Sequence, residues 1–197
     1  SVWYEPTDIK KARKPWDLPG SNSILFTSPN LNEFNAIVKF LSKGKAKDVV
    51  HSSCEDESFV QRIVEESKNY LSNLKAIMIS LGNKGFIVVR QYTKDEDSSI
   101  YSKPKKSTDY DDEMIGLYFQ IGTNYSISSV SGAGDCLAAG FVAGMIQGKR
   151  VSECAFIGQS CATASLKSSE AVPNSLDPNF IYSAKPLPYK IISNLKI

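Results

Sequence analysis

The sequence predicts an α/β fold, in which a layered sheet carries helices on both faces. Short apolar runs of strand length alternate along the chain with segments whose apolar residues recur at helical spacing, as in α/β layers. With 197 residues, 42% hydrophobic and 22% charged, the chain has the composition of a globular protein with one buried core. A glycine-containing segment stands between a strand and a helix, where layered sheets bind ligands. We therefore expect a binding site at the carboxyl ends of the strands.

Charge and cysteine content exclude several classes of protein. The 23 basic and 21 acidic residues are interspersed and give a net charge of +2, which argues against a nucleic-acid-binding or membrane-surface protein. No apolar run approaches the roughly eighteen residues that span a bilayer. His51 is the single histidine and no CxxC pair is present, so most zinc sites and histidine-based triads are excluded. Without a signal-peptide pattern, we expect a cytoplasmic protein whose thiols are reduced: Cys54, Cys136, Cys154 and Cys161.

The first part of the chain predicts two strands and two helices. The apolar runs Val2-Trp3-Tyr4 and Ile24-Leu25-Phe26 stop near prolines, as buried strands do at turns. Apolar residues from Leu31 to Leu41 recur at helical spacing, and Asn30 is placed to cap that helix. The same spacing predicts a second helix over residues 58–74.

A hairpin and two helices are predicted next. Apolar runs at 76–81 and 86–89 flank a tight turn at Gly82–Gly85. The polar segment 93–113 is predicted to be a solvated surface insertion, with a regulatory or partner-binding loop as the alternative. A strand over 114–121 and helices over 134–147 and 152–166 follow, whereas the proline-rich tail from Lys167 stays unassigned.

The segment Ser131-Gly132-Ala133-Gly134-Asp135 is the candidate site. Its glycines leave backbone amides uncovered, and the following helix directs its positive end at the same place, so an anion such as phosphate fits there. Beside a bound phosphate, the carboxylate of Asp135 can take a proton from a hydroxyl group. A dinucleotide fingerprint would need glycine where Leu137 stands. The segment Gly144–Arg150 imitates a P-loop but is one spacer short, lacks the Ser/Thr, and lies at a helix end.

These residues resemble the PfkB, or ribokinase-like, family of sugar and nucleoside kinases. The family signature D-T-x-G-A-G-D, with a glycine five residues on, is similar to Gly132–Asp135 and Gly140, although Ser129-Val130 replace Asp-Thr. The motif P-N-x-x-E is similar to Pro29–Glu33, and T-L-G-x-x-G is similar to Ser80–Gly85. The resemblance implies the C-terminal part of a ribokinase-like α/β/α fold. Residues 1–197 would form the ATP-binding and catalytic part of a PfkB-type kinase domain.

The resemblance implies roles for the glycine segment. Asp135 would be the general base, and the amides of Gly132, Ala133 and Gly134 would hold the transferring phosphoryl group. The alternatives are a helix-capping aspartate and a tight turn that needs small residues. Some family members bind potassium through the first aspartate of the signature. Ser129 stands at that position without the charge, so a potassium requirement is left open.

Three other groups of residues acquire implied roles. Asn30 and Glu33 would act on Mg²⁺ through bound waters, although they can also form a helix capping box, and both roles can hold together. Nucleotide-binding residues would be Ser80, Gly82 and Gly85, for which a simple hairpin turn is the alternative. On the helix after the catalytic one, Gln159, Ser160 and Thr163 face the implied adenine position, with Ser160 the first candidate for a contact.

A softer similarity indicates the acceptor. Val2–Asp8 resembles the matching stretch of pseudouridine kinases, including the kinase half of bifunctional pseudouridine-metabolising proteins. The implied reaction transfers phosphate from ATP to the 5′-hydroxyl of pseudouridine; ribose, adenosine or another sugar is the alternative acceptor. The family's substrate-binding and lid residues precede the first strand found here. We therefore expect half of a longer kinase, for which a homodimer is one assembly, or else a non-catalytic nucleotide-binding fragment or truncated isoform.

Overall fold

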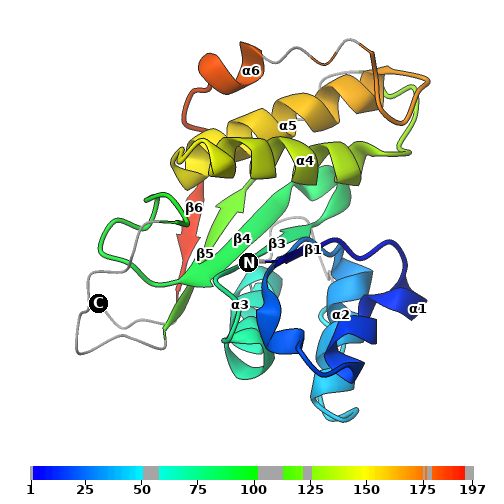
Figure 1. Cartoon of the computed structure of the whole chain (residues 1–197), viewed down its shortest axis with the longest axis vertical. Helices are drawn as coiled ribbons and strands as arrows, with labels where there is room; N and C mark the ends of the chain where they lie inside the picture. The colour runs from blue at the N-terminus through cyan, green and yellow to red at the C-terminus, as the bar shows by residue number, and fades with distance from the viewer. Residues whose placement is uncertain are drawn as a thin grey trace. The chain divides into compact units, whose positions relative to one another are not determined.

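The structure is a computed structural model that describes residues 2–50, 58–101, 113–121, 126–174, 176 and 179–193. The chain divides into two compact units (Figure 1). The first contains the described residues of 1–94, 105–120 and 190–197, and the second contains those of 95–104 and 121–189. His51 and Cys54 lie outside the described residues, as do residues 102–112 of the predicted insertion.

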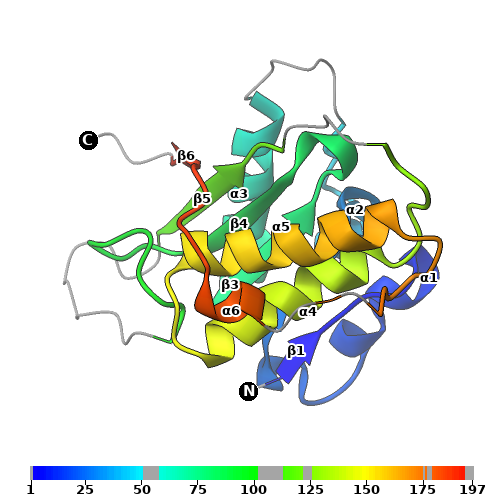
Figure 2. The same ribbon diagram turned by 90° about the horizontal axis from the view of Figure 1, so that it is seen from above.

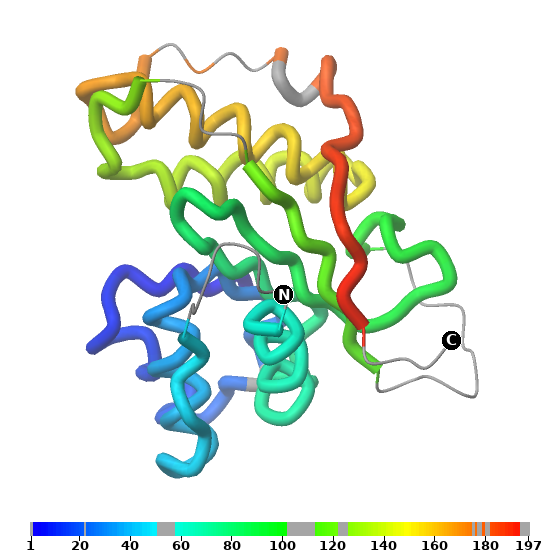
Figure 3. Tube along the Cα trace, turned by 180° about the vertical axis from the view of Figure 1, so that it is seen from behind, coloured from blue at the N-terminus to red at the C-terminus, as the bar shows by residue number. Residues whose placement is uncertain are grey.

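The first unit is built on a six-stranded sheet with the strand order β1-β2-β3-β4-β5-β6. Strands β1, β2 and β3 are parallel, whereas β4, β5 and β6 each run antiparallel to the strand before. Figure 3 shows β6, red, alongside β5. The hairpin predicted around Gly82–Gly85 is confirmed as the β3–β4 pair. The strands are β1 (Val2–Tyr4), β2 (Ile24–Thr27), β3 (Ala76–Ser80), β4 (Phe86–Gln91), β5 (Met114–Phe119) and β6 (Lys190–Ile192).

Two amphipathic helices cover one face of this sheet. Helix α2 (Leu31–Leu41) has the predicted bounds, and α3 (Ser58–Leu71) ends three residues before its predicted end. Both lie on the same side of the strands in Figure 1. Alternate strand residues such as Ile77 and Ile79 join the apolar stripes of the helices in one core, as the period of two requires. A short helix α1 (Ile9–Ala12) and two 3-10 turns (Lys14–Asp17, Ser21–Ser23) complete the segment between β1 and β2.

The second unit is a pair of helices, α4 (Ala133–Ile146) and α5 (Val151–Lys167), followed by the short α6 (Asn179–Tyr182). Figure 2 shows α4 and α5 side by side. The helices approach closely through glycines, since a Cβ on Gly158 would lie 2.6 Å from the Leu137 carbonyl oxygen. Among the described residues, no helix combines the length and the apolar character that crossing a bilayer requires.

The described residues of the predicted insertion include two buried side chains. Asp97 and Ile100 are each only 6% exposed, whereas Lys94, Asp95 and Tyr101 are exposed. Asp97 is buried because Arg150 and Ser152, more than fifty residues later, hold its carboxylate. A polar segment can become part of the interior when long-range partners satisfy its polar groups.

Candidate functional site

The predicted anion site is the start of helix α4. Gly132 precedes the helix with a left-handed φ of 78°, a conformation that glycine adopts without steric cost. The first turn carries Asp135, whose side chain is exposed. The structure therefore presents the acid at a helix N-terminus, where the helix dipole favours negative charge.

The backbone amides of Ala133, Gly134 and Asp135 form what we call the amide cluster, which begins one residue later than the Gly132–Gly134 set expected from the sequence because Gly132 precedes the helix. The first hydrogen bond of α4 runs from the Cys136 amide to the Gly132 carbonyl, 2.9 Å, and the three preceding amides have no acceptor among the described residues. A Cβ on Gly134 would meet no described atom within 4 Å. Open space and unused donors at this point suit a small anion.

The segment before α4 is held in place by the end of α5. The amide of Ser128 donates to the Leu166 carbonyl oxygen, 2.8 Å. The Ser165 hydroxyl, which is buried, lies within hydrogen-bond distance of the carbonyl oxygens of Ser131, 3.3 Å, and Ala171, 2.9 Å. These contacts fix the amide cluster to α5 rather than leaving it on an unsupported loop.

A cavity of about 660 Å³, here the α5 cavity, runs along the same helix. Its volume is within the usual range for small-molecule sites. The Ser160 hydroxyl donates to the Phe156 carbonyl, 2.8 Å, while the buried Oε1 of Gln159 has no partner among the described residues. The cavity includes the three residues expected at the adenine position; its lining is Phe156, Gln159, Ser160, Thr163, Ala164, Lys167, Ser168 and Leu187.

Helix α5 joins the cavity to the amide cluster. The lining residues Lys167 and Ser168 follow directly after Leu166, whose carbonyl oxygen holds the segment before α4. At the other end, Phe156 and Leu187 supply apolar surface. An elongated ligand with a flat apolar group at one end and an anion at the other matches this arrangement.

The other predicted residues belong to the first unit. Asn30 and Glu33 form a capping box: the Glu33 amide donates to Asn30 Oδ1, 3.0 Å, and the Asn30 amide donates to Glu33 Oε2, 2.9 Å. The structure brings this motif to Ser80, since Asn30 and Ser80 form a parallel bridge and the Ser80 amide donates to Pro29 O, 3.1 Å. Two motifs fifty residues apart in sequence therefore meet at the ends of β2 and β3.

The two glycines of the hairpin turn have different reasons to be glycine. Gly85 has a φ of 102°, and a Cβ there would collide with the Phe119 carbonyl group. The close packing of Gly85 against β5 is therefore enough to require glycine at this position, without any role in ligand binding. Gly82 also has a positive φ, 63°, but nothing described lies within 4 Å of its Cβ position. Of the two, only Gly82 leaves open space for a ligand.

Sequence reasoning missed Glu5 and Ser28, which follow strands β1 and β2. The Ser28 hydroxyl donates to the Glu5 carboxylate and accepts from Trp3 Nε1, 2.6 Å. The position of a polar residue directly after a buried parallel strand was the available signal.

The carboxylates near these strand ends are better placed to contact a cation through its bound water than to coordinate it directly. Burial first, and then the charges of Glu33, Asp8 and Glu5, raise the pKa of Tyr4, so the local field is negative. Glu33 is only 5% exposed and its Oε2 already accepts the Asn30 amide. No group of three metal-ligating side chains occurs among the described residues. Contact through metal-bound water therefore fits Asn30 and Glu33, because Mg²⁺ retains several waters.

Comparison with known proteins agrees with the resemblance of the motifs. Residues 122–177, which include the amide cluster, match the model of the pfkB family of carbohydrate kinases. The similarity to these kinases thus includes the segment in which helix α4 begins. The chain is 22% identical over 210 residues to a pseudouridine kinase of Arabidopsis thaliana, which covers 87% of this chain and 51% of that protein.

Solved structures share the fold. A protein assigned as a sugar kinase, from Clostridium perfringens, superposes with a TM-score of 0.62 at 14% identity, covering 91% of this chain and 45% of its own. An Arabidopsis thaliana ribokinase, solved with ribose and ATP, superposes with a TM-score of 0.56 at 16% identity, covering 92% and 46%. The chain is thus a partial ribokinase-like fold and spans about half the length of these relatives.

Proposed function

We propose that this chain carries the nucleotide-binding and catalytic-base part of an ATP-dependent kinase whose acceptor is a nucleoside or sugar hydroxyl. The observation that carries the proposal is the position of Asp135, exposed on the first turn of α4 and itself part of the amide cluster. The α5 cavity on the neighbouring helix supports it, because ATP is an elongated ligand with a flat base and an anionic end.

In the proposed reaction, the Asp135 carboxylate takes the proton of the acceptor hydroxyl. The acceptor oxygen then forms a bond to the γ-phosphorus, and the bond to the β–γ bridging oxygen breaks, leaving ADP with the electron pair. The amide cluster donates hydrogen bonds to the oxygens on which charge builds in the transition state. Asn30 and Glu33, which belong to the first unit, are the residues proposed to hold Mg²⁺ through water.

No step is assigned to potassium. The Ser129 hydroxyl, at the position of the acidic ligand in the family signature, carries no charge and accepts the Ser131 amide at 3.2 Å.

Pseudouridine is the proposed acceptor. The similarity of Val2–Asp8 and the Arabidopsis relative named as a pseudouridine kinase both favour it. Ribose and adenosine are the competing acceptors, each offering the same type of hydroxyl group.

The test is release of ADP from Mg-ATP by this chain, with and without each acceptor. Asp135→Asn keeps the shape of the side chain and removes the base, so turnover should fall by about 10²–10⁴-fold while ATP binding persists. Glu170→Gln, which removes an exposed acid in the same unit, serves as the control and should leave turnover unchanged. Near-normal turnover by Asp135→Asn would exclude the assigned role. Saturable ATP binding without any release would instead favour a non-catalytic nucleotide-binding chain.

A further inference from the structure

Helix α5 receives only part of its N-terminal cap from its own sequence, where Glu153 Oε2 accepts the Arg150 amide at 2.9 Å. The residue before the helix is Arg150, whose side chain has donors only. The first two amides of the helix bond to Asp97 instead: Val151 N to the Asp97 carbonyl, 3.0 Å, and Ser152 N to Asp97 Oδ1, 2.6 Å. Asp97 thus satisfies donors that a local serine or aspartate normally satisfies.

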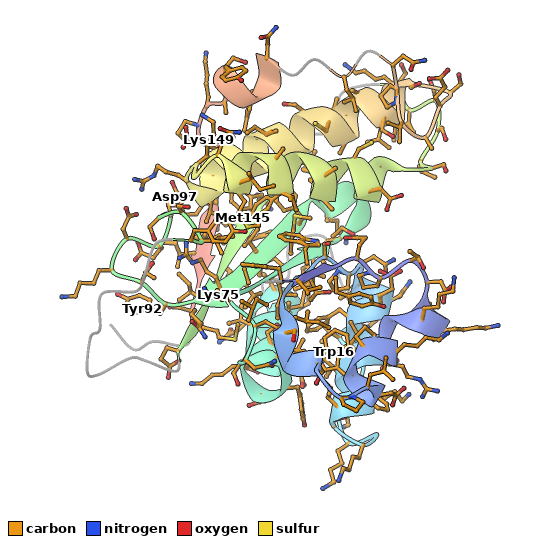
Figure 4. The ribbon with its side chains drawn as sticks, viewed as in Figure 1. Trp16, Lys75, Tyr92, Asp97, Met145 and Lys149 are labelled. Carbon is orange, nitrogen blue, oxygen red and sulfur yellow. The ribbon has the colours of Figure 1, made fainter. Side chains whose placement is uncertain are left out.

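The Asp97 carboxylate is buried and fully engaged. Its Oδ2 accepts from the Ser152 hydroxyl, 2.7 Å, and from Arg150 Nε, 2.8 Å. The neighbouring Asp95 also accepts from Arg150, 2.8 Å, but its side chain is 55% exposed, against 8% for that of Asp97. Figure 4 labels Asp97 near Lys149, at the end of the helix pair where α5 begins. Such charge-assisted bonds in a buried place are strong and directional.

The same residue that Asp97 holds also positions the wall of the α5 cavity. Ser152 is completely buried, and its carbonyl oxygen accepts the amide of Leu187, 3.1 Å. Leu187 lines the cavity, as does Phe156, one helical turn after Ser152 on the same face. A continuous chain of contacts therefore runs from Asp97 through Ser152 to the apolar end of the cavity.

We propose that Asp97 is a positioning residue for the nucleotide base, acting through Ser152 on Leu187 and the first turn of α5. This inference rests on the proposed function, because it assigns the base of ATP to the apolar end of the α5 cavity. It gives the start of the 93–113 segment a role in binding, although its polar composition indicates only surface.

The test compares two ligands that differ in the nucleotide base, the part of ATP that Asp97 is proposed to position. ATP extends from the amide cluster to the apolar end of the cavity, whereas tripolyphosphate lacks the base and engages the amide cluster alone. Asp97→Asn should weaken ATP binding by calorimetry by about tenfold, the usual effect of losing hydrogen bonds to a charged group, and leave tripolyphosphate binding unchanged.

Asp95→Asn is the matched control, because it removes the same charge from the exposed partner of the same arginine. Its ATP affinity should equal that of the wild type. Ser152→Ala removes the side-chain link but keeps the backbone cap, and should weaken ATP binding selectively as well. It carries the test if Asp97→Asn does not fold.

Each outcome decides the proposal. Selective loss of ATP affinity in Asp97→Asn, absent in Asp95→Asn, supports it. Equal loss for ATP and tripolyphosphate would show a general structural role and overturn it, as would wild-type affinity in both Asp97→Asn and Ser152→Ala. If the wild-type chain binds neither ligand, the proposed function fails, and this inference fails with it. If the wild-type chain binds both ligands but the variants show no selective loss of ATP affinity, only this inference fails.

Discussion

The backbone of Gly132 lies directly against Ala171. A Cβ on Gly132 would be 2.8 Å from the carbonyl carbon and 2.9 Å from the Cα of Ala171, closer than real Cβ atoms approach. The Ala171 carbonyl oxygen is in turn within 2.9 Å of the Ser165 hydroxyl of α5. Gly132, the residue before helix α4, therefore combines a left-handed backbone conformation with close packing against the backbone of Ala171. These two constraints fix the position of the amide cluster that follows.

Gly132→Ala should destabilise the chain by about 2–3 kcal/mol, because a left-handed alanine is strained and its Cβ displaces the backbone at Ala171. Urea unfolding measures the change. Gly148→Ala is the control, since Gly148 has a similar φ of 71° but open space around it. It should cost only about 1–2 kcal/mol, the conformational part. Equal losses in the two variants would show that the contact with Ala171 adds nothing.

Gly134→Ala, in contrast, should leave stability intact and weaken anion binding. Gly134 is within α4 without a positive φ, and no described atom would touch its Cβ, so stability should stay the same or rise by up to about 1 kcal/mol. If an anion occupies the amide cluster, the new methyl group should weaken tripolyphosphate binding, measured by calorimetry, by about tenfold. Unchanged affinity in a stable Gly134→Ala variant would place the anion elsewhere.

Asn30→Ala should cost about 1 kcal/mol in the free energy of unfolding, because the amide of Glu33 loses its cap. Asn30→Asp keeps an acceptor oxygen at that place and should unfold at the wild-type midpoint. The pair separates the capping role from the proposed role toward Mg²⁺. A defect in Mg²⁺-dependent ATP binding that appears in Asn30→Asp without loss of stability belongs to the metal role, whereas matching defects in both measurements belong to the cap.

Elements whose signals are local were predictable from the sequence. Helix α2 has the predicted bounds because its cap, its apolar stripe and its end lie within twelve residues, Asn30 to Leu41. Strand β6 was not predicted, because its three residues pair with β5, which lies more than seventy positions earlier. A long-range pair such as Leu117 and Ile191 produces no pattern in the sequence around either residue. The short helix α1 was missed for a related reason, since four residues are too few for a period to show.

In the candidate site, too, residues with local sequence signals were predictable and residues placed by long-range contacts were not. The sequence identifies Gly132 and Asp135 because a glycine turn and a helix start are adjacent in the chain. Residues that reach the site through tertiary contacts have no such signature. Leu187 reaches the α5 cavity through a backbone bond to Ser152, and Asp97 is buried by partners more than fifty residues away. Ordinary periodicity and composition carry no information about either contact.

Cys154 offers a test of how tightly helices α4 and α5 pack. Its side chain is only 1% exposed, and its thiol donates to the Lys149 carbonyl oxygen at 3.7 Å. Burial first, and then the charges of Glu153 and Asp97, raise the pKa of this thiol from 9.0 to about 12. The folded chain thus keeps a proton that the unfolded chain loses.

The stability that Cys154 contributes is therefore fully present below pH 9 and is lost as the pH rises toward 12. Between these values the free energy of unfolding should fall by about 1.4 kcal/mol per pH unit through this group. Urea unfolding at pH 8 and pH 10 should show a shallower fall in Cys154→Ala than in the wild type. The difference in slope isolates this thiol from Tyr4 and Tyr189, whose pKa values burial also raises. A slope that Cys154→Ala leaves unchanged would mean that water reaches this thiol, and that the two helices separate far more readily than their close packing implies.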